Sequence, residues 1–300
     1  MSSQPVSTLQ PPLAKESLEF SYYPGCSLES TACEYNDSVL QVFAALGVGL
    51  HELEDWSCCG ASSAHSLSRR LSLALPTRNQ AIAQKAGRDV VMPCAACFNR
   101  HKTADYALRN DPQRRAFLQN AAGFEFNGSV QVRPLLGVVS QEIGLERVES
   151  QVRRPLRSLK VVGYYGCLLV RPHEITQFED PEHPTLMNRL LEALGAEART
   201  WSNATDCCGG GLSLTKSSTA TRLVTRLADR AREAGADAIV TSCPLCQVNL
   251  EMRQGGAAPR LPIFYFTELM GLAFGLEAAR NWWGKHLVSP KALLGSLQLL

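Results

Sequence analysis

Cys58-Cys59-Gly60 followed by Cys94-Ala95-Ala96-Cys97 recurs later in the chain as Cys207-Cys208-Gly209 followed by Cys243-Pro244-Leu245-Cys246. In both copies, 35 positions separate the second cysteine of the pair from the first cysteine of Cys-x-x-Cys. A lone cysteine precedes each pair, Cys26 in the first copy and Cys167 in the second. Two equal spacings of this length do not arise by chance, so the sequence predicts an internal duplication.

The duplication extends to the sequence around the cysteines. Tyr22-Tyr23-Pro24-Gly25-Cys26 matches Tyr164-Tyr165-Gly166-Cys167. The tripeptide Ala45-Leu46-Gly47 returns as Ala193-Leu194-Gly195, eleven or twelve positions before the Cys-Cys pair. We therefore expect two halves that are built in the same way.

Each half is predicted to alternate strands and helices. Short β-rich runs at 20–23 and 161–165 lead to the lone cysteines, and buried strands at 89–92 and 237–240 lead to the Cys-x-x-Cys groups, each of which opens a helix. Helices are expected at 32–46 and 184–194, each ended by a glycine in the left-handed conformation. A short strand should then lead to Cys-Cys-Gly.

A long helix is predicted after each Cys-Cys-Gly, because apolar residues recur there at helical spacing. These residues are Leu67, Leu71, Leu75 and Ile82 in one half and Leu223, Leu227, Ala231 and Ala234 in the other. The alternation predicts an α/β fold with two pseudo-symmetric repeats, each a small Rossmann-like parallel sheet with flanking helices. Ligands of open parallel sheets sit at the carboxyl ends of strands, so each cysteine set is expected to converge on one edge.

The chain is expected to divide into three segments. Residues 1–17 are polar and contain three prolines, which predicts a disordered N-terminus. We place a first cysteine-rich domain at 18–150 and a second at 151–300. Residues 112–156 have no recognisable counterpart in the second half and are predicted to form helices and a connection.

Composition excludes several classes of protein. The 300 residues are 45% hydrophobic, the net charge is +2, and charges of both signs are interspersed, so nothing favours a nucleic-acid partner. No apolar stretch approaches the length of a membrane span or a signal peptide, and we expect a soluble, cytoplasmic protein. Eleven cysteines in such a chain indicate metal or redox chemistry rather than a disulfide framework.

Five thiols in each half favour a soft or borderline metal, either zinc or iron in an iron–sulfur cluster. Structural zinc takes four ligands and would leave one thiol unused, and an ordinary cubane cluster also needs four cysteines. The fifth thiol therefore indicates a cluster that is larger or more open than a cubane. The candidate ligands are Cys26, Cys58, Cys59, Cys94 and Cys97 in the first half and Cys167, Cys207, Cys208, Cys243 and Cys246 in the second.

Other candidate residues have weaker signals. Gly60 and Gly209-Gly210-Gly211 could bring backbone N–H groups close to cluster sulfurs, or could form plain turns. Cys33 has no partner in the second half and is expected to be a packed thiol. Arg171 could attract an anionic substrate or partner, or form an ordinary surface pair. The aromatic pair Trp282-Trp283 could form a docking surface or pack on the core. Packing or surface positions are expected for the histidines, which are His51, His65, His101, His173, His183 and His286.

The complete pattern resembles the subunit of heterodisulfide reductase that carries twin cysteine-rich CCG domains, over about Tyr22 to Gln254. Four sequence motifs carry the resemblance, and they are Tyr-Tyr-Pro-Gly-Cys-Ser-Leu, Asp-Trp-Ser-Cys-Cys-Gly-Ala, Cys-Ala-Ala-Cys-Phe-Asn-Arg and Cys-Pro-Leu-Cys-Gln-Val-Asn-Leu. These motifs are similar to those of the bacterial form of this subunit, found in sulfur-oxidising bacteria. The resemblance to that form implies a substrate carried by a lipoate-bearing protein.

The resemblance implies that each five-cysteine set binds one noncubane [4Fe–4S] cluster, two in all. It implies an oxidoreductase acting on sulfur groups, in which a disulfide or thiol substrate lies between the clusters. It also implies two partners, a small subunit with cubane iron–sulfur clusters and a flavin-bearing subunit.

Two alternatives remain at this point. Similar CCG domains occur in iron–sulfur subunits that only relay electrons for membrane-associated dehydrogenases. The sequence favours the catalytic hypothesis, because both motifs are complete and no Cys-x2-Cys-x2-Cys run is present in the chain. A zinc-stabilised scaffold is the other alternative.

Overall fold

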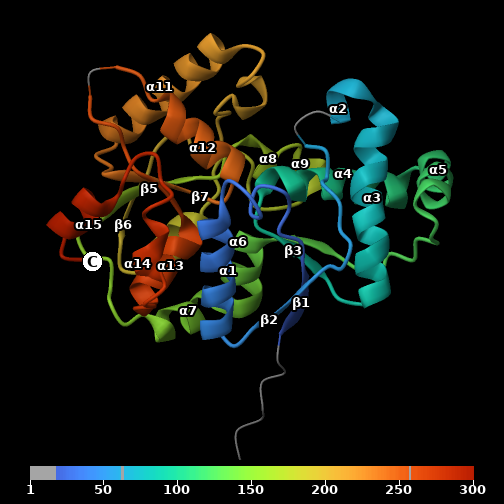
Figure 1. Cartoon of the computed structure of the whole chain (residues 1–300), viewed down its shortest axis with the longest axis horizontal. Helices are drawn as coiled ribbons and strands as arrows, with labels where there is room; N and C mark the ends of the chain where they lie inside the picture. Colours follow the sequence, from blue (N-terminus) through green and yellow to red (C-terminus); the bar gives the residue numbers. More distant parts are fainter. Residues whose placement is uncertain (1–17, 62–63, 257) are drawn as a thin grey trace, which may run out of the picture.

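The computed structural model describes residues 18–61, 64–256 and 258–300. The disorder predicted for residues 1–17 lies outside the described residues. Two four-stranded parallel sheets with flanking helices make up the fold, which confirms the predicted α/β class with two similar halves (Figure 1).

The two sheets have the same strand order, β2-β1-β3-β4 in the first half and β6-β5-β7-β8 in the second. The strands of the first sheet are β1 (Glu19–Tyr22), β2 (Gly49–Glu52), β3 (Val90–Met92) and β4 (Val132–Pro134). Those of the second are β5 (Lys160–Tyr164), β6 (Glu197–Arg199), β7 (Ala238–Thr241) and β8 (Ile263–Tyr265). The strands β3 and β7 are buried throughout and carry hydrophobic side chains on both faces, as helix-covered parallel sheets require.

Helices connect the strands in both halves. The first half contains α1 (Cys33–Ala45), α2 (Ala64–Leu67), α3 (Arg69–Ala86), α4 (Ala95–Asn110), α5 (Pro112–Ala122), α6 (Leu135–Gly137), the π-helical turn η1 (Val138–Gly144) and α7 (Leu145–Gln151). The second contains α8 (Cys167–Val170), α9 (His173–Thr176), α10 (Leu186–Ala193), the 3₁₀ turn η2 (Gly210–Leu212), α11 (Ser217–Glu233), α12 (Pro244–Arg253), α13 (Phe266–Phe274), α14 (Ala279–Trp282) and α15 (Lys291–Ser296). Gly47 and Gly195 follow α1 and α10 with φ of +63° and +85°, so both predicted glycine caps are confirmed.

The prediction that residues 112–156 have no counterpart is wrong in part. This segment contains β4 and the helices after it, which match β8 and α13 in the second half. Gly144-Leu145-Glu146 even recurs as Gly275-Leu276-Glu277, and both glycines have positive φ. The match was missed because β4 and β8 are three residues long, too short for a recognisable period.

The long helices after Cys-Cys-Gly differ between the halves. In α11, Leu227 and Ala231 are buried, as the apolar spacing predicts. In the first half, Leu67 and Leu71 are exposed, to 77% and 41%. The helix is broken at Ser68, whose side chain accepts a hydrogen bond from the Leu71 amide and caps α3, so the two leucines do not share one helical face.

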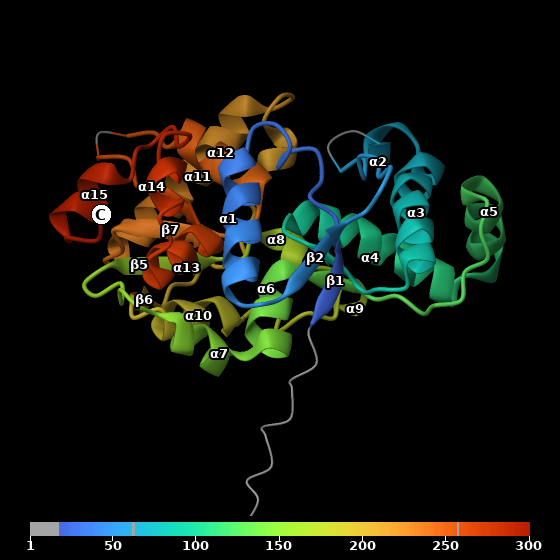
Figure 2. The same ribbon diagram turned by 60° about the horizontal axis from the view of Figure 1, so that its bottom comes forward.

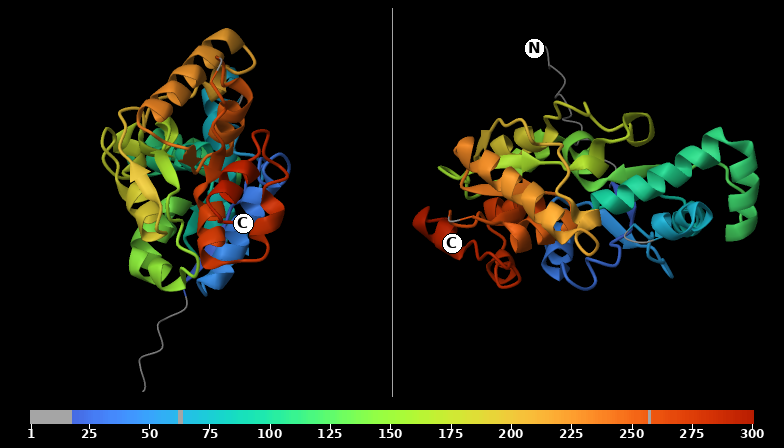
Figure 3. Two further views of the ribbon diagram at one scale, coloured as in Figure 1. Left: turned by 90° about the vertical axis from the view of Figure 1, so that its left-hand side faces the viewer. Right: turned by 90° about the horizontal axis from the view of Figure 1, so that it is seen from above.

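The two halves pack through reciprocal pairs of helices. Helix α1 packs on α13, and its counterpart α10 packs on α6, η1 and α7, so equivalent helices of the two halves each meet the last helices of the other half (Figure 2). One hydrophobic core runs through both halves. Viewed from above, α4 and α5 form the end of the molecule that lies farthest from the C-terminus (Figure 3). Among the described residues, no helix is long and apolar enough to cross a membrane.

Candidate functional site

Every predicted cysteine group lies just beyond the carboxyl end of a strand. Cys26 follows β1, the pair Cys58-Cys59 follows β2, and Cys94 caps the helix after β3. The same placement repeats after β5, β6 and β7 in the second half. Parallel strands deliver their carboxyl ends to one edge, so each half gathers its cysteines there.

The first set consists of thiols in close pairs. The Sγ atoms of Cys58 and Cys26 lie 3.7 Å apart, and those of Cys59 and Cys97 lie 3.4 Å apart. The backbone N–H of Gly60 donates to the Sγ of Cys58 at 3.4 Å. All eleven cysteines of the chain are free thiols, so the vicinal pairs form no disulfide.

The second set repeats these contacts. The Cys208 and Cys246 Sγ atoms lie 3.6 Å apart, and the Gly209 N–H donates to the Sγ of Cys207 at 3.3 Å. Cys167 and Cys207, which correspond to Cys26 and Cys58, also shift each other's pKa and are therefore neighbours. Equivalent cysteines therefore meet in both halves.

Glycines leave the space in which the last thiol of each set lies. A Cβ on Gly25 would come 3.1 Å from the Cys97 Sγ, and a Cβ on Gly166 would come 3.3 Å from the Cys246 Sγ. Both glycines have positive φ, of +75° and +65°. Gly60 and Gly209 also have positive φ and pack closely against a following helix. A Cβ on Gly60 would meet Ala64, and a Cβ on Gly209 would meet Leu223. Both turns therefore need glycine.

A tyrosine at the end of the first strand supports each set. The Tyr23 hydroxyl donates to the Ser57 carbonyl just before Cys58, and the Tyr164 hydroxyl donates to the Asp206 carbonyl just before Cys207. Burial, together with neighbouring cysteine charges, raises the pKa of both phenols, which therefore stay protonated and act as donors.

The two sets face each other across the junction of the halves. The Cys94 and Cys243 thiols are neighbours across this junction, since each shifts the pKa of the other. The Tyr35 hydroxyl lies 3.2 Å from the Pro93 carbonyl and 3.1 Å from the Ser242 carbonyl, the residues just before these cysteines. Ten predicted cysteines thus form two adjoining groups rather than two distant ones.

The close thiol pairs hold their protons unequally. Contacts with Cys58 and Cys97 lower the pKa of Cys59, and the contact with Cys167 lowers the pKa of Cys207 to about 6. The contacts with Cys59 and Cys94, together with burial, raise the pKa of Cys97. Thiolates are the form that binds metal, so both sets contain sulfurs that ionise readily.

Sequence reasoning missed the part that His101 plays beside the first set. His101 is fully buried, its Nδ1 lies 2.8 Å from the Cys97 carbonyl, and its ring packs on Tyr23. Burial lowers its pKa, so the imidazole is neutral and orients the first turn of α4. Its position four residues after Cys97, on the same helical face, could have indicated this contact. The second half has Leu250 there.

The remaining candidates have structural surroundings. Cys33 is exposed, and its thiol donates to the Ser30 carbonyl at 3.1 Å rather than joining the first set. The prediction that Cys33 is packed is therefore wrong, because Cys33 is the first residue of α1 and its side chain is exposed. Arg171 pairs with Glu182 at 2.7 Å and donates to the Thr205 carbonyl, which fixes the loop after Cys167. Trp282 and Trp283 are buried, as packing predicts.

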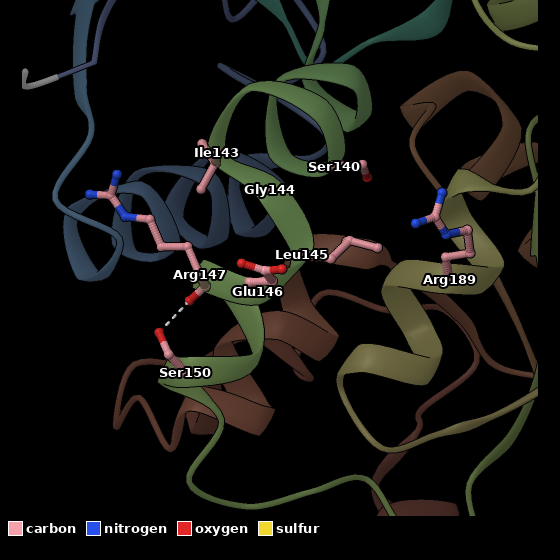
Figure 4. Close-up of a pocket in the computed structure, with 8 residues that line it drawn as sticks. All are labelled: Ser140, Ile143, Gly144, Leu145, Glu146, Arg147, Ser150 and Arg189. Atoms are coloured by element: carbon pink, nitrogen blue, oxygen red, sulfur yellow. Dashed lines mark hydrogen bonds between the residues drawn. The ribbon is translucent and has the colours of Figure 1, made fainter. Parts of the chain in front are cut away.

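The residues present fit an iron–sulfur group. Soft sulfur donors converge in both halves, glycines clear space beside them, and backbone N–H groups already point at sulfur. Among the described residues, no group of three or more His, Cys, Asp or Glu side chains is arranged around a single metal ion. A cavity of about 490 Å³ lies elsewhere, near α7 at the amino-terminal side of the sheets, and is lined by Ser140, Arg147 and Arg189 (Figure 4).

Similarity to known proteins extends over most of the chain. The cysteine-rich domain model, CCG, matches residues 20–100 and 161–251. The chain is 32% identical to the 8-methylmenaquinol:fumarate reductase membrane anchor subunit of Wolinella succinogenes, over 87% of this chain and 93% of that protein. It is 28% identical to a subunit of the ferredoxin/F(420)H(2)-dependent CoB-CoM heterodisulfide reductase of Methanosarcina acetivorans, over 85% of this chain and 86% of that protein.

The fold also resembles a solved structure. A hypothetical protein from Helicobacter pylori superposes with a TM-score of 0.70 at 11% identity, and the match covers 96% of this chain. The chain spans about half of that protein, since 54% of it is covered.

Proposed function

Because this chain belongs to the cysteine-rich CCG domain family, we propose that it is an iron–sulfur subunit of a heterodisulfide reductase-like complex. The observation that carries the proposal is the contact between Cys94 and Cys243, which brings two equivalent five-cysteine sets together. Relatives that are named as subunits of heterodisulfide reductases, at 28% identity over most of the chain, support it.

We assign one [4Fe–4S] cluster to each set, of the noncubane type, because each half presents five thiols where a cubane needs four. The first cluster would use Cys26, Cys58, Cys59, Cys94 and Cys97, and the second Cys167, Cys207, Cys208, Cys243 and Cys246. When bound, the clusters would supply single electrons to a substrate held between them. The chain's own part is to bring the sulfurs together and to orient them through Tyr23, Tyr164 and Tyr35.

The proposed reaction is thiol–disulfide redox chemistry. Cleavage of a disulfide consumes two electrons and two protons and releases two thiols, and the reverse reaction returns them. The electrons are exchanged with partner subunits, for which we propose a small cubane iron–sulfur subunit and a flavin-bearing subunit in the cytoplasm. The finer hypothesis of sulfur oxidation on a lipoate-carried substrate rests on the resemblance of the sequence motifs.

Elemental analysis tests the cluster assignment. The protein is purified without oxygen, and iron, acid-labile sulfide and zinc are measured per chain. We expect eight iron atoms per chain, the content of the two [4Fe–4S] clusters implied by the motifs. A colourless product that contains zinc and no sulfide would refute the proposal in favour of a zinc scaffold.

An electron-relay subunit is the second candidate, and one finding favours it. The relative at 32% identity is named as a subunit of a menaquinol:fumarate reductase, whose substrates contain no disulfide. In this role the chain would pass electrons between other subunits, and no substrate would enter between the cysteine sets.

Paramagnetic resonance separates the two candidates. The iron-loaded protein is oxidised in the presence of a disulfide or thiol, with lipoamide, a coenzyme M–coenzyme B heterodisulfide and glutathione disulfide as separate samples. A substrate that binds at iron changes the resonance signal, and we expect such a change with at least one of them. Identical spectra with all thiols and disulfides would favour the relay.

A further inference from the structure

A cationic groove lies beside the first cysteine set and takes no part in holding it. We define the arginine groove as the cavity of about 540 Å³ between α2, α3, α4 and α5. Its lining includes His65, Arg69, Arg70, Arg100, Arg114 and Phe117. The volume and the mixture of apolar and charged side chains are those of a binding site.

The charges of this groove are largely unmatched. Arg114 forms an ion pair with Asp111, and the Arg70 guanidinium lies over the Phe117 ring at 5.3 Å. Within the described part of the chain, no carboxylate is placed to pair with Arg69, Arg70 or Arg100. The Nε of Arg100 is buried and makes no hydrogen bond there. A buried guanidinium nitrogen without a protein partner is left for water or for an incoming acceptor.

The second half provides an internal comparison. Helix α11 corresponds to α3, but three of its four arginines are paired, Arg226 with Asp206, Arg230 with Glu233 and Arg232 with Asp229. The groove also depends on α5, whereas the described residues between β7 and β8 contain α12 and no second helix. The excess of positive charge is therefore a feature of this end of the molecule and not of the repeat.

Helix physics makes the position of two of these arginines unfavourable. Arg69 and Arg70 occupy the first turn of α3, where the helix dipole disfavours cations and where no acidic residue is present. The exposed Leu67, Leu71 and Phe117 lie on the same elements. Arginine and aromatic or large apolar side chains together are typical of protein-binding surfaces.

We propose that the arginine groove docks an acidic segment of a partner protein, in which carboxylates alternate with apolar side chains. The groove adjoins the first cysteine set, because α2 and α3 pack on the Gly60 turn and Arg100 lies one helical turn after Cys97. A partner held there is placed to exchange electrons with that set. This electron-transfer role rests on the proposed function, whereas the docking itself does not.

Binding of a defined probe tests the docking. The probe is a short fluorescent peptide of repeating Glu-Glu-Leu-Phe, titrated with the full chain and followed by fluorescence anisotropy. We expect saturable binding that weakens as salt rises, and that weakens about tenfold or more in the double variant Arg69→Glu, Arg70→Glu. The matched control is Arg222→Glu on α11, an exposed arginine in the equivalent helix, which should bind like the wild type.

The outcomes are distinguishable from misfolding and from failure of the proposed function. The double variant should melt no lower than the wild type, because glutamate suits the first turn of a helix.

Equal peptide binding by wild type and double variant overturns the docking, as does no binding by the wild type. Stronger binding of citrate or pyrophosphate than of the peptide overturns it in favour of a free anion, and binding of anionic phosphatidylglycerol vesicles alone overturns it in favour of a membrane. Iron is measured in the same samples, and a chain that binds the peptide without iron supports the docking while refuting the cluster assignment.

Discussion

At the scale of single residues, glycine decides how closely the sulfurs can approach. Gly25 and Gly166 occupy equivalent positions, both have positive φ and lie against the last cysteine of each set. The repeated Tyr-Pro-Gly-Cys and Tyr-Tyr-Gly-Cys motifs indicated the position of this contact in the sequence. The sequence did not predict which sulfur each glycine contacts, because Cys97 and Cys246 belong to a different strand and helix from the glycines.

Replacing Gly25 by alanine should disturb the first set. The alanine costs about 1–2 kcal/mol for the left-handed conformation, and its methyl group additionally pushes on the Cys97 Sγ. We expect the variant to lose iron from the first set. Gly87→Ala is the control, because Gly87 has φ of +69° and a Cβ at this position would have no atom within 4 Å. It should lose similar stability in urea titrations and keep its iron, so equal iron loss in both variants would contradict a role for the sulfur contact.

Removing one thiolate from either set should lower the iron content. Cys59→Ala and Cys208→Ala each delete a buried sulfur that contacts the last cysteine of its set. We expect each variant to lose about half of the bound iron, since a ligand of one cluster is lost and the other set is intact. Cys33→Ala is the control, because this thiol is exposed and donates to the Ser30 carbonyl rather than to a cysteine of the first set. Full iron in both ligand variants would show that the assignment is wrong.

At the scale of helices and strands, the pattern of the sequence predicted the elements better than their burial. The strands before the cysteines and the glycine-ended helices lie where the motifs placed them, because hydrophobic runs and helix caps are local signals. The exposed Leu67 and the unrecognised β4 were missed for physical reasons. The exposure of Leu67 depends on a helix break at Ser68, and β4 depends on hydrogen bonds to β3, a strand more than forty positions away.

A buried charge cluster joins the helices α12 and α13 to the segment after α14. His286 lies between Glu251 of α12 and Glu268 of α13, at 3.1 and 2.9 Å, and its side chain is fully buried. Burial alone would lower its pKa, but the two carboxylates outweigh burial and raise the pKa to about 10. The histidine is therefore charged, and it holds the helix that carries Cys246.

The stability of the protein should depend on pH through this histidine. Because the pKa is raised by folding, the contribution is complete below about pH 6.5 and is lost as pH rises through about 10. We expect His286→Gln to be less stable by on the order of 3–5 kcal/mol near pH 6, with the difference shrinking toward pH 10. Urea titrations at several pH values measure it, and His183→Gln, at an exposed position, is the control. A difference that stays constant with pH would contradict a charged His286.

At the scale of the whole molecule, the two halves form one unit. The reciprocal packing of α1 on α13 and of α10 on α7 places both sets at one junction. Duplication of the sequence predicted two similar sites, but their adjacency depends on contacts between residues more than two hundred positions apart, such as Tyr35 and Ser242. No local pattern encodes such a contact, so the adjacency of the two sets followed only from the family resemblance, which implies a substrate between the clusters.

Tyr35 is the residue through which this junction can be tested. Its ring stacks on Tyr265 of the other half, with centroids 3.9 Å apart and planes 1° from parallel, and its hydroxyl lies within reach of the carbonyls before Cys94 and Cys243. Tyr35→Phe keeps the stacking and removes the hydroxyl, which should cost about 1–3 kcal/mol because buried carbonyls lose their donor. Tyr106→Phe is the control, since Tyr106 is exposed.

The shared core predicts that both halves respond together to this change. Trp56 reports on the first half and Trp201 on the second, and each can be observed alone after the other tryptophans are replaced by phenylalanine. In anaerobic urea titrations, we expect both reporters to give the same midpoint, and Tyr35→Phe to shift both midpoints equally to lower urea. A shift confined to one reporter would mean that the halves unfold independently, and that the contact between Cys94 and Cys243 joins two separately stable domains.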